Sequence, residues 1–244
     1  MKIPTTFEPT ELIQKGLNLH FVFELDELPE SIISDLANQH PNLNHFKQLI
    51  LIGNAGKHLW SHLKEHHFPS LKEQSLNPID DFTCDSINNW FEQHHPNLTK
   101  KIIYPSTHSI ALQALGQLAH WHYPSPFLVG INNQHGSWFA YRAAVLSDSQ
   151  FSNPKQHQTH SPCTNCQSKV CVTQCPAQAL TQNTFHMDKC LDYRLTKGSL
   201  CQDTCLAREA CPAGAHQKYS KEQLQYHYGI SLKMIRKLSN VKKM

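Results

Sequence analysis

Apolar positions in the first 150 residues recur with the periods of strands and helices. Strands are predicted at 17–25, 46–52, 101–104, 127–131 and 137–146. Helices are predicted at 57–65 and 110–119, and a third begins at Asn77, where Asn77 and Pro78 are typical of a helix start. Because strands and helices alternate, the pattern predicts an α+β or mixed α/β sheet layer.

The pattern changes after this region. Residues 147–162 are polar, which predicts a linker at 151–162. The segment 163–220 has too few large apolar side chains for an ordinary core, so bonds to a ligand must supply much of its stability. The sequence therefore predicts a domain at 1–150, a small cysteine-rich domain at 163–220 and a basic helix or tail at 221–244.

Composition narrows the class of protein. The chain has 244 residues, of which 39% are hydrophobic and 17% charged, as in compact soluble proteins. No apolar run approaches the roughly 20 residues that cross a bilayer, so we expect no contact with a membrane. The first residues show no secretory leader, and we expect a cytoplasmic protein.

Charge is distributed unevenly along the chain. Residues 1–150 carry nine Lys and Arg against fourteen Asp and Glu, whereas residues 151–244 carry thirteen against five. A basic half suggests nucleic acid as a partner. However, deprotonated metal-bound thiols would offset much of the positive charge, and the tail has few aromatic residues for stacking on bases. We therefore do not expect nucleic acid to be a partner.

Eight of the nine cysteines lie within one short segment. They are Cys163, Cys166, Cys171, Cys175, Cys190, Cys201, Cys205 and Cys211. In a reducing compartment such a cluster is more often metal-binding than disulfide-linked. Four thiols within thirteen residues suit an iron-sulfur cluster better than zinc, whose ligands come as separated pairs. Zinc and simple buried thiols are the alternatives.

The cysteine spacing, with Pro after Cys175 and after Cys211, resembles that of bacterial two-cluster ferredoxins. In that family the fourth cysteine of each half binds the cluster of the other half. The resemblance implies two [4Fe-4S] clusters. Its first ligand set is Cys163, Cys166, Cys171 and Cys211, and its second is Cys175, Cys190, Cys201 and Cys205.

Other motifs resemble two cobalamin-related families. The segment CLDYRLTKG at 190–198 is similar to epoxyqueuosine reductase, a cobalamin-dependent tRNA-modifying enzyme with two [4Fe-4S] clusters. The segments LIGNAG at 51–56, NPID at 77–80 and HGSWFAYR at 135–142 are similar to the cobalamin-processing protein. The resemblance covers about residues 45–212. It implies a flavin-reductase-like (nitroreductase-like) α+β domain with a mixed sheet, followed by a dicluster ferredoxin-like domain.

The same resemblance implies a corrinoid site in the first domain. A corrin plate fringed with amides needs close backbone approach, polar side chains and apolar walls. The residues expected to supply these are Gly53, Asn54, Gly56, Gln113, Gly136, Trp138 and Tyr141. Alternatively, the glycines only end strands and the aromatic residues only pack the sheet.

The chain departs from these families at two points. Residues 104–108 read YPSTH and hold no acid where epoxyqueuosine reductase has its catalytic aspartate. No Asp-x-His-x-x-Gly motif occurs, so a bound corrinoid would lack a protein histidine as lower ligand, the base-off form.

Other candidate residues have simpler interpretations. Histidines at 58, 62 and 66 share one face of a predicted helix, and we expect this face to be exposed to solvent and not to bind a metal. His108, His120, His122 and His135 flank the expected pocket, and Cys84 fits a core position on its helix.

The sequence thus predicts an iron-sulfur, cobalamin-dependent oxidoreductase. Electrons from a flavodoxin, a ferredoxin or a reductase would pass through two clusters to a corrinoid, for cobalamin reduction, upper-ligand removal or a corrinoid-dependent reduction. The alternatives are a ferredoxin-type electron carrier without corrinoid and an RNA-modifying reductase similar to epoxyqueuosine reductase.

Overall fold

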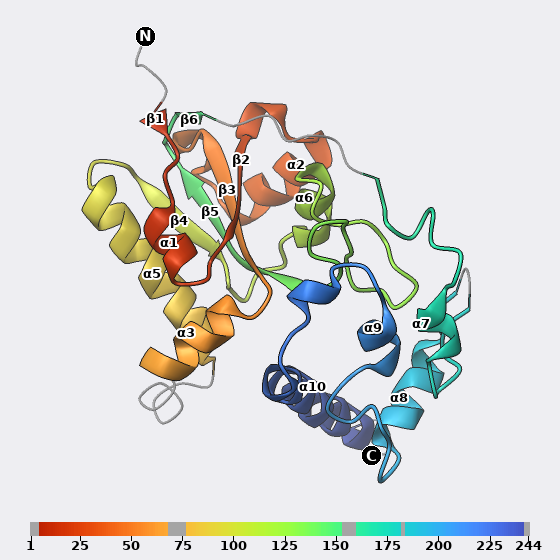
Figure 1. The fold of residues 1–244 in the computed structure, drawn as a ribbon. Helices are drawn as coiled ribbons and strands as arrows, with labels where there is room; N and C mark the ends of the chain where they lie inside the picture. Colours follow the sequence, from red (N-terminus) through yellow and green to blue (C-terminus); the bar gives the residue numbers. More distant parts are fainter. Residues whose placement is uncertain (1–4, 68–76, 153–159, 182–183, 242–244) are drawn as a thin grey trace. The chain divides into compact units, whose positions relative to one another are not determined.

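The computed structural model describes residues 5–67, 77–152, 160–181 and 184–241 (Figure 1). The chain divides into two compact units. The first contains residues 1–119 and 139–157, and the second contains 120–138 and 158–244. This division differs from the boundaries predicted from the sequence, because the segment 120–138 packs with the cysteine-rich residues.

The first unit is built on a four-stranded sheet with the order β2-β3-β5-β4. Its strands are β2 (Leu19–Glu24), β3 (Gln48–Ala55), β4 (Lys100–Tyr104) and β5 (Phe139–Ser147). All three pairings are antiparallel, so this sheet is not the mixed sheet that was expected. The α+β class is confirmed. A separate two-stranded parallel sheet joins β1 (Thr5–Thr6) to β6 (Phe151–Ser152), within the predicted linker.

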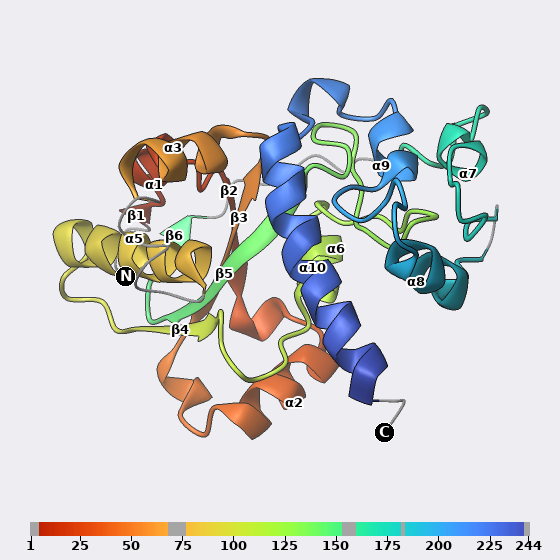
Figure 2. The ribbon, with the colours of Figure 1, turned by 90° about the horizontal axis from the view of Figure 1, so that it is seen from below.

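Helices cover both faces of the sheet. Figures 1 and 2 show α1, α3 and α5 on one side and α2 and α6 on the other. These helices are α1 (Thr10–Gln14), α2 (Glu30–Gln39), α3 (His58–His66), α5 (Pro78–His94) and α6 (Leu112–Leu118); 3-10 turns η1 (Leu25–Glu27) and η2 (Leu43–His45) flank α2. Every residue of β3 is consequently buried, as its continuous apolar sequence predicts.

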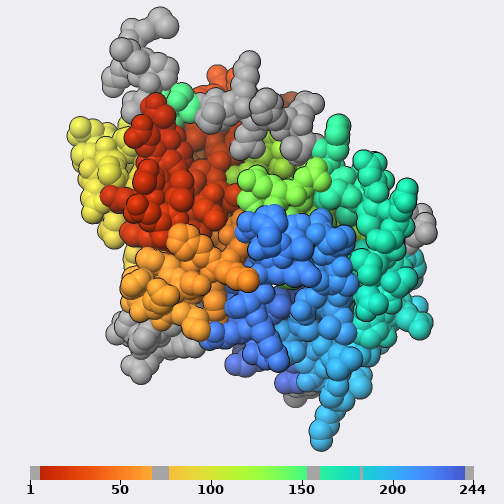
Figure 3. Space-filling model, in the orientation of Figure 1, coloured from red at the N-terminus to blue at the C-terminus, as the bar shows by residue number. Residues whose placement is uncertain are grey.

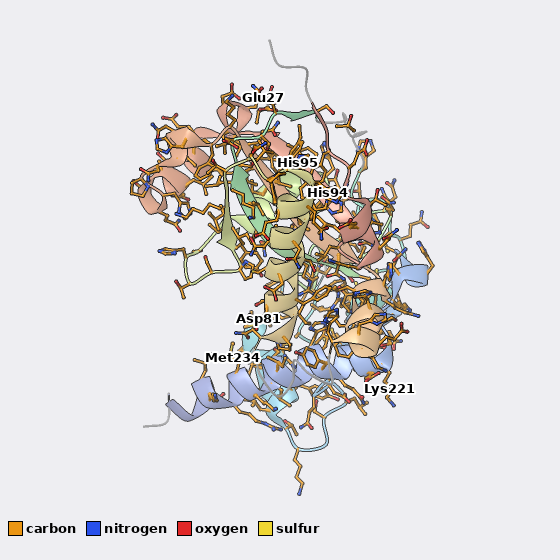
Figure 4. The ribbon with its side chains drawn as sticks, turned by 90° about the vertical axis from the view of Figure 1, so that its left-hand side faces the viewer. Glu27, Asp81, His94, His95, Lys221 and Met234 are labelled. Atoms are coloured by element: carbon orange, nitrogen blue, oxygen red, sulfur yellow. The ribbon has the colours of Figure 1, made fainter. Side chains whose placement is uncertain are left out.

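Helix α5 begins as the sequence predicts. Pro78 occupies the first turn, where its missing N–H costs nothing, and Asp80 and Asp81 place negative charge at the positive end of the helix dipole. Figure 4 shows Asp81 near this end and His94 and His95 near the other. His94 Nε2 lies 3.1 Å from Oε1 of Glu11 on α1, which ties the two helices together.

The second unit contains short helices and one long one. They are α7 (Val170–Thr173), α8 (Met187–Leu195), α9 (Leu206–Ala210), the 3-10 turn η3 (Ala215–Gln217) and α10 (Lys221–Val241). Helices α7 and α9 pack together, and Figure 3 shows the teal surface around α7 beside the blue surface around α8 and α9. Figure 4 labels Lys221 and Met234 on α10. None of the helices in the described part of the chain is long and apolar enough to cross a membrane.

The strand predicted at 127–131 is wrong. Leu128 has a φ of +60°, which a strand does not allow, and only Ile131 forms an isolated bridge, to Tyr123. Phe127 and Ile131 pack in the apolar cluster of the second unit. Their apolar character reflects this packing.

Gln48, at the start of β3, connects the sheet to β6. Its side chain is fully buried, and Nε2 donates to Oε1 of Glu24 at 2.5 Å and to the carbonyl oxygen of Phe151 at 2.8 Å. Its Oε1 accepts from the hydroxyl of Ser149 at 2.8 Å and from the backbone N–H of Phe151 at 2.9 Å. One amide therefore satisfies four buried or half-buried polar groups.

We predict that Gln48→Leu lowers the free energy of unfolding by about 2–4 kcal/mol, because both backbone groups of Phe151 lose their partner inside the protein. Urea denaturation of the full chain measures the change. Gln117→Leu, at an exposed position of α6, is the control and should change stability by less than about 0.5 kcal/mol. Equal effects of the two variants would contradict this account of Gln48.

Candidate metal centres

The cysteine-rich residues form their own small apolar core. Its buried members include Cys171 and Cys211, and Cys163, Cys175 and Cys205 pack against it. All nine cysteines of the chain are free thiols. Thiols thus hold positions that larger apolar side chains occupy in ordinary cores.

One cavity of the second unit, of about 410 Å³, is lined by Cys163, Cys166, Cys171 and Cys211. Phe127, Ile131 and Pro212 add apolar wall to it. These four thiols are the first ligand set implied by the resemblance to two-cluster ferredoxins.

A second cavity, of about 400 Å³, is lined by Cys175, Cys190, Cys201 and Cys205. These thiols are the second implied ligand set. Phe127 lines this cavity as well as the first. An aromatic side chain from the segment 120–138 therefore forms part of the wall of both cavities.

The backbone near the first cysteine set is held by a left-handed residue and by hydrogen bonds to Cys163. Lys169 adopts a left-handed conformation with a φ of +41° directly before α7, and its Nζ donates to the carbonyl oxygen of Cys163 at 2.6 Å. The backbone N–H of Cys163 is bound by the hydroxyl of Ser161 at 3.2 Å. Pro176 and Pro212 follow the last cysteine of each half and limit the path of the chain.

The electrostatics of the thiols differ between positions. Burial raises the pKa of Cys190 to about 11 and also raises the pKa of Cys163, Cys171, Cys201, Cys205 and Cys211. In Cys166 hydrogen bonds from the backbone of Lys169 and the hydroxyl of Ser168 lower the pKa. Most of these thiols are therefore neutral near pH 7, and a cationic group that bound them would have to displace their protons.

No three His, Cys, Asp or Glu side chains among the described residues are grouped to hold a single metal ion. This holds for the thiols, which line two larger cavities, and for the histidines of α3. The rings of His62 and His66 lie 4.8 Å apart, and burial lowers the pKa of His62.

The residues expected to contact a corrinoid fall into both units. Gly53 and Asn54 lie in β3, where Asn54 Oδ1 accepts from Arg142 Nε at 2.6 Å. The Nδ2 atom of Asn54 is buried without a hydrogen-bond partner. Gly56 has a φ of +72° in the turn before α3, a conformation that suits glycine. Contact of these residues with a ligand stays a prediction.

Tyr141 and Gln113 also belong to the first unit. The phenol of Tyr141 lies over Gly116, where an added Cβ would come within 1.8 Å of the hydroxyl oxygen. Burial raises the pKa of Tyr141 above its usual range. Gln113, on α6, is exposed.

Gly136 and Trp138 belong instead to the second unit. Gly136 has a φ of +57°, and a Cβ there would come within 2.0 Å of the carbonyl oxygen of Ala213. Trp138 is fully buried, with the guanidinium of Arg208 4.4 Å from its ring centre and Tyr219 on its edge at 5.4 Å. Packing of the cysteine-rich unit accounts for both residues, and their contact with a corrinoid stays a prediction.

The sequence argument named the segments of Asp80 and Arg142 but missed that the two residues and Tyr104 lie close together in the first unit. Asp80 is half-buried, burial raises the pKa of its carboxyl, and the charge of Arg142 opposes that rise. Tyr104 lies close enough that Asp80 raises its pKa further, after burial. Asp80 on α5 thus places a carboxyl near Tyr104, the first residue of the segment 104–108, which itself holds no acid.

Arg194 and Arg208 were missed as well, although both are only 8% exposed. Arg194 follows Cys190 by four residues on α8, and Arg208 on α9 follows Cys205, the residue directly before that helix, by three. These spacings place neighbours on one helix face and are the signal that would have found them.

Comparison with known proteins agrees with this fold. No protein-family model matches the chain, and no curated protein matches its sequence. Epoxyqueuosine reductase from Streptococcus thermophilus superposes with a TM-score of 0.53 at 14% identity, over 84% of this chain and 64% of that chain. An epoxyqueuosine reductase solved with a tRNA-Tyr epoxyqueuosine-modified stem loop gives a TM-score of 0.50 at 13% identity, over 88% and 67%. These likenesses show the fold alone, and this chain spans about two thirds of the length of either protein.

A B12-trafficking protein of C. elegans, CblC, gives a TM-score of 0.41 at 12% identity, over 86% of this chain and 84% of that chain. That value is too low to support an argument about fold or function.

We predict that Gly136→Ala destabilises the second unit by at least about 1 kcal/mol, because alanine is strained at positive φ and its Cβ would collide with Ala213. Gly229→Ala on α10 is the matched control: a Cβ there meets nothing within 4 Å, and alanine favours the helix. The midpoint temperature of thermal unfolding should fall for Gly136→Ala and rise for Gly229→Ala. A shift in the same direction would contradict the packing described for Gly136.

Proposed function

We propose that the second unit binds two [4Fe-4S] clusters and that the protein delivers their electrons to a corrinoid held by the first unit. The observation that carries this proposal is the sorting of eight thiols into two cavities, four to each. That sorting matches the crossed ligand sets implied by the two-cluster ferredoxin spacing.

The residues present fit such clusters chemically. Thiolates are the ligands that iron-sulfur clusters require, and the lining of both cavities is mainly apolar. When bound, the clusters supply one-electron transfer. The chain's part is to hold the eight sulfurs, to release their protons on binding and to keep the surroundings apolar.

The corrinoid part of the proposal depends on the first unit. Its fold is similar to that of epoxyqueuosine reductase, the cobalamin-dependent family that the sequence motifs resemble. The buried, unpaired Nδ2 of Asn54 and the exposed amide of Gln113 are donors of the kind that a ring of amide side groups accepts. Without the histidine motif, we expect the corrinoid to bind in the base-off form.

Nucleic acid stays open as a partner. One similar structure is that of an epoxyqueuosine reductase with a tRNA stem loop, so the expectation that nucleic acid is not a partner has no support from the fold. The lack of an acid at 104–108 still argues against the same substrate chemistry. We therefore keep RNA modification as the alternative that the binding experiment below separates.

We predict about eight iron and eight sulfide per chain after anaerobic reconstitution, with the broad absorption of [4Fe-4S] clusters. Cys171→Ala and Cys190→Ala each remove one ligand of one set and should lower the iron content to about four per chain. Cys84→Ala, outside both sets, should leave it at about eight. A protein that takes up zinc and no iron would refute the proposal.

We predict that cobalamin added to the reconstituted protein takes on the base-off absorption spectrum and binds with saturation. Asn54→Leu removes the unpaired amide and should weaken binding about tenfold, whereas Gln117→Leu on the exposed face of α6 should not. An unchanged cobalamin spectrum would contradict the corrinoid part of the proposal and favour the ferredoxin-type carrier. Saturable binding of a tRNA stem loop, with activity that depends on its modified base, would instead favour the RNA-modifying reductase.

A further inference from the structure

Arg194 is held rigidly beside the second cysteine set. Its Nε donates to the carbonyl oxygen of Cys201, its Nη1 to the hydroxyl of Ser231 and its Nη2 to the carbonyl oxygen of Tyr228, each at 3.1 Å. The guanidinium lies 5.2 Å from the ring centre of Tyr228, and Arg194 lines the second cavity.

Arg208 is held on the same unit by another group of neutral partners. Its Nε donates to the hydroxyl of Ser137 at 3.2 Å, and its Nη2 donates to the carbonyl oxygen of Ser137. Trp138 and Tyr219 lie against the guanidinium at 4.4 and 5.2 Å. The backbone of Arg208 also donates to the sulfur of Cys205.

The hydrogen bonds described for both guanidiniums end on neutral oxygens, so they do not cancel the positive charge. A buried charge acts through a lower effective dielectric constant than an exposed one, and is screened less by salt. The cations that act on the thiols of the first set are Lys169 and Lys218, and both are only half-buried. Glu209 opposes the arginines near Cys201, and its Oε1 accepts from the hydroxyl of Thr204, but it is a single half-buried anion against two buried cations.

We propose that the buried positive charges of Arg194 and Arg208 hold the reduction potential of the cluster in the second cysteine set above that of the cluster in the first. This inference rests on the proposed function. Reduction adds one negative charge to a cluster, so fixed positive charge nearby favours the reduced form. At equilibrium, an electron shared by the two clusters would therefore reside mainly at the second set.

The test is a redox titration of the anaerobically reconstituted full chain, followed by electron paramagnetic resonance. Arg194→Gln and Arg208→Gln should each lower the higher of the two reduction potentials. The expected change is at least tenfold in the equilibrium constant for reduction, which is about 59 mV for a one-electron couple. Glu209→Gln should raise the same potential. Lys169→Gln should lower only the other one, and Lys237→Gln, exposed on α10, should move neither.

The conservative variants separate charge from packing. Arg194→Lys and Arg208→Lys lose hydrogen bonds but keep the charge, so their potentials should stay near the wild-type value. If Arg194→Gln or Arg208→Gln fails to take up iron, the shift of the reduction potential in Glu209→Gln tests the inference instead. The inference is overturned if no shift accompanies loss of charge at 194, 208 or 209 in iron-loaded protein. A wild-type chain without iron would instead overturn the proposed function.

Discussion

The second unit depends on keeping eight thiols together in a part of the chain that has little else to bury. Cys171 and Cys211 are themselves core residues there, packed against Ile131 and Ala207. Ionising such thiols without a counter-charge would put unpaired anions in an apolar setting, and their raised pKa values express that cost. Binding of a cationic group to these thiols would therefore be coupled to folding and to deprotonation.

Part of the positive charge in the second half of the chain lies in the interior of the second unit. Arg194 and Arg208 are buried in the second unit, so two of the thirteen basic residues of the second half are not available at the surface. The exposed basic residues that remain lie mainly on α10. An argument from net charge to a nucleic-acid partner must leave the two arginines out.

Local patterns in the sequence predicted most elements of the first unit. The apolar run of β3 and the start of α5 at Pro78 follow from residues that are neighbours in the chain, and the structure confirms both. The two cysteine sets came from the resemblance to two-cluster ferredoxins, and the thiols of each set line one cavity. The places of Phe127, in the cysteine-rich cluster, and of Trp138, in the cluster with Tyr219 and Leu224, could not be predicted, because an apolar side chain packs a sheet equally well.

What sequence spacing could not reveal is that the chain contributes to the second unit twice. Residues 120–138, between α6 and β5, supply Phe127 to both cavities and Trp138 and Ser137 to the site of Arg208. A ferredoxin-like unit beginning at Cys163 would lack these groups. Part of the wall of each cavity, and the groups that accept hydrogen bonds from Arg208, thus come from a segment inserted in the sequence of the first unit. The two units cannot be separated by one cut without removing part of the cysteine environment.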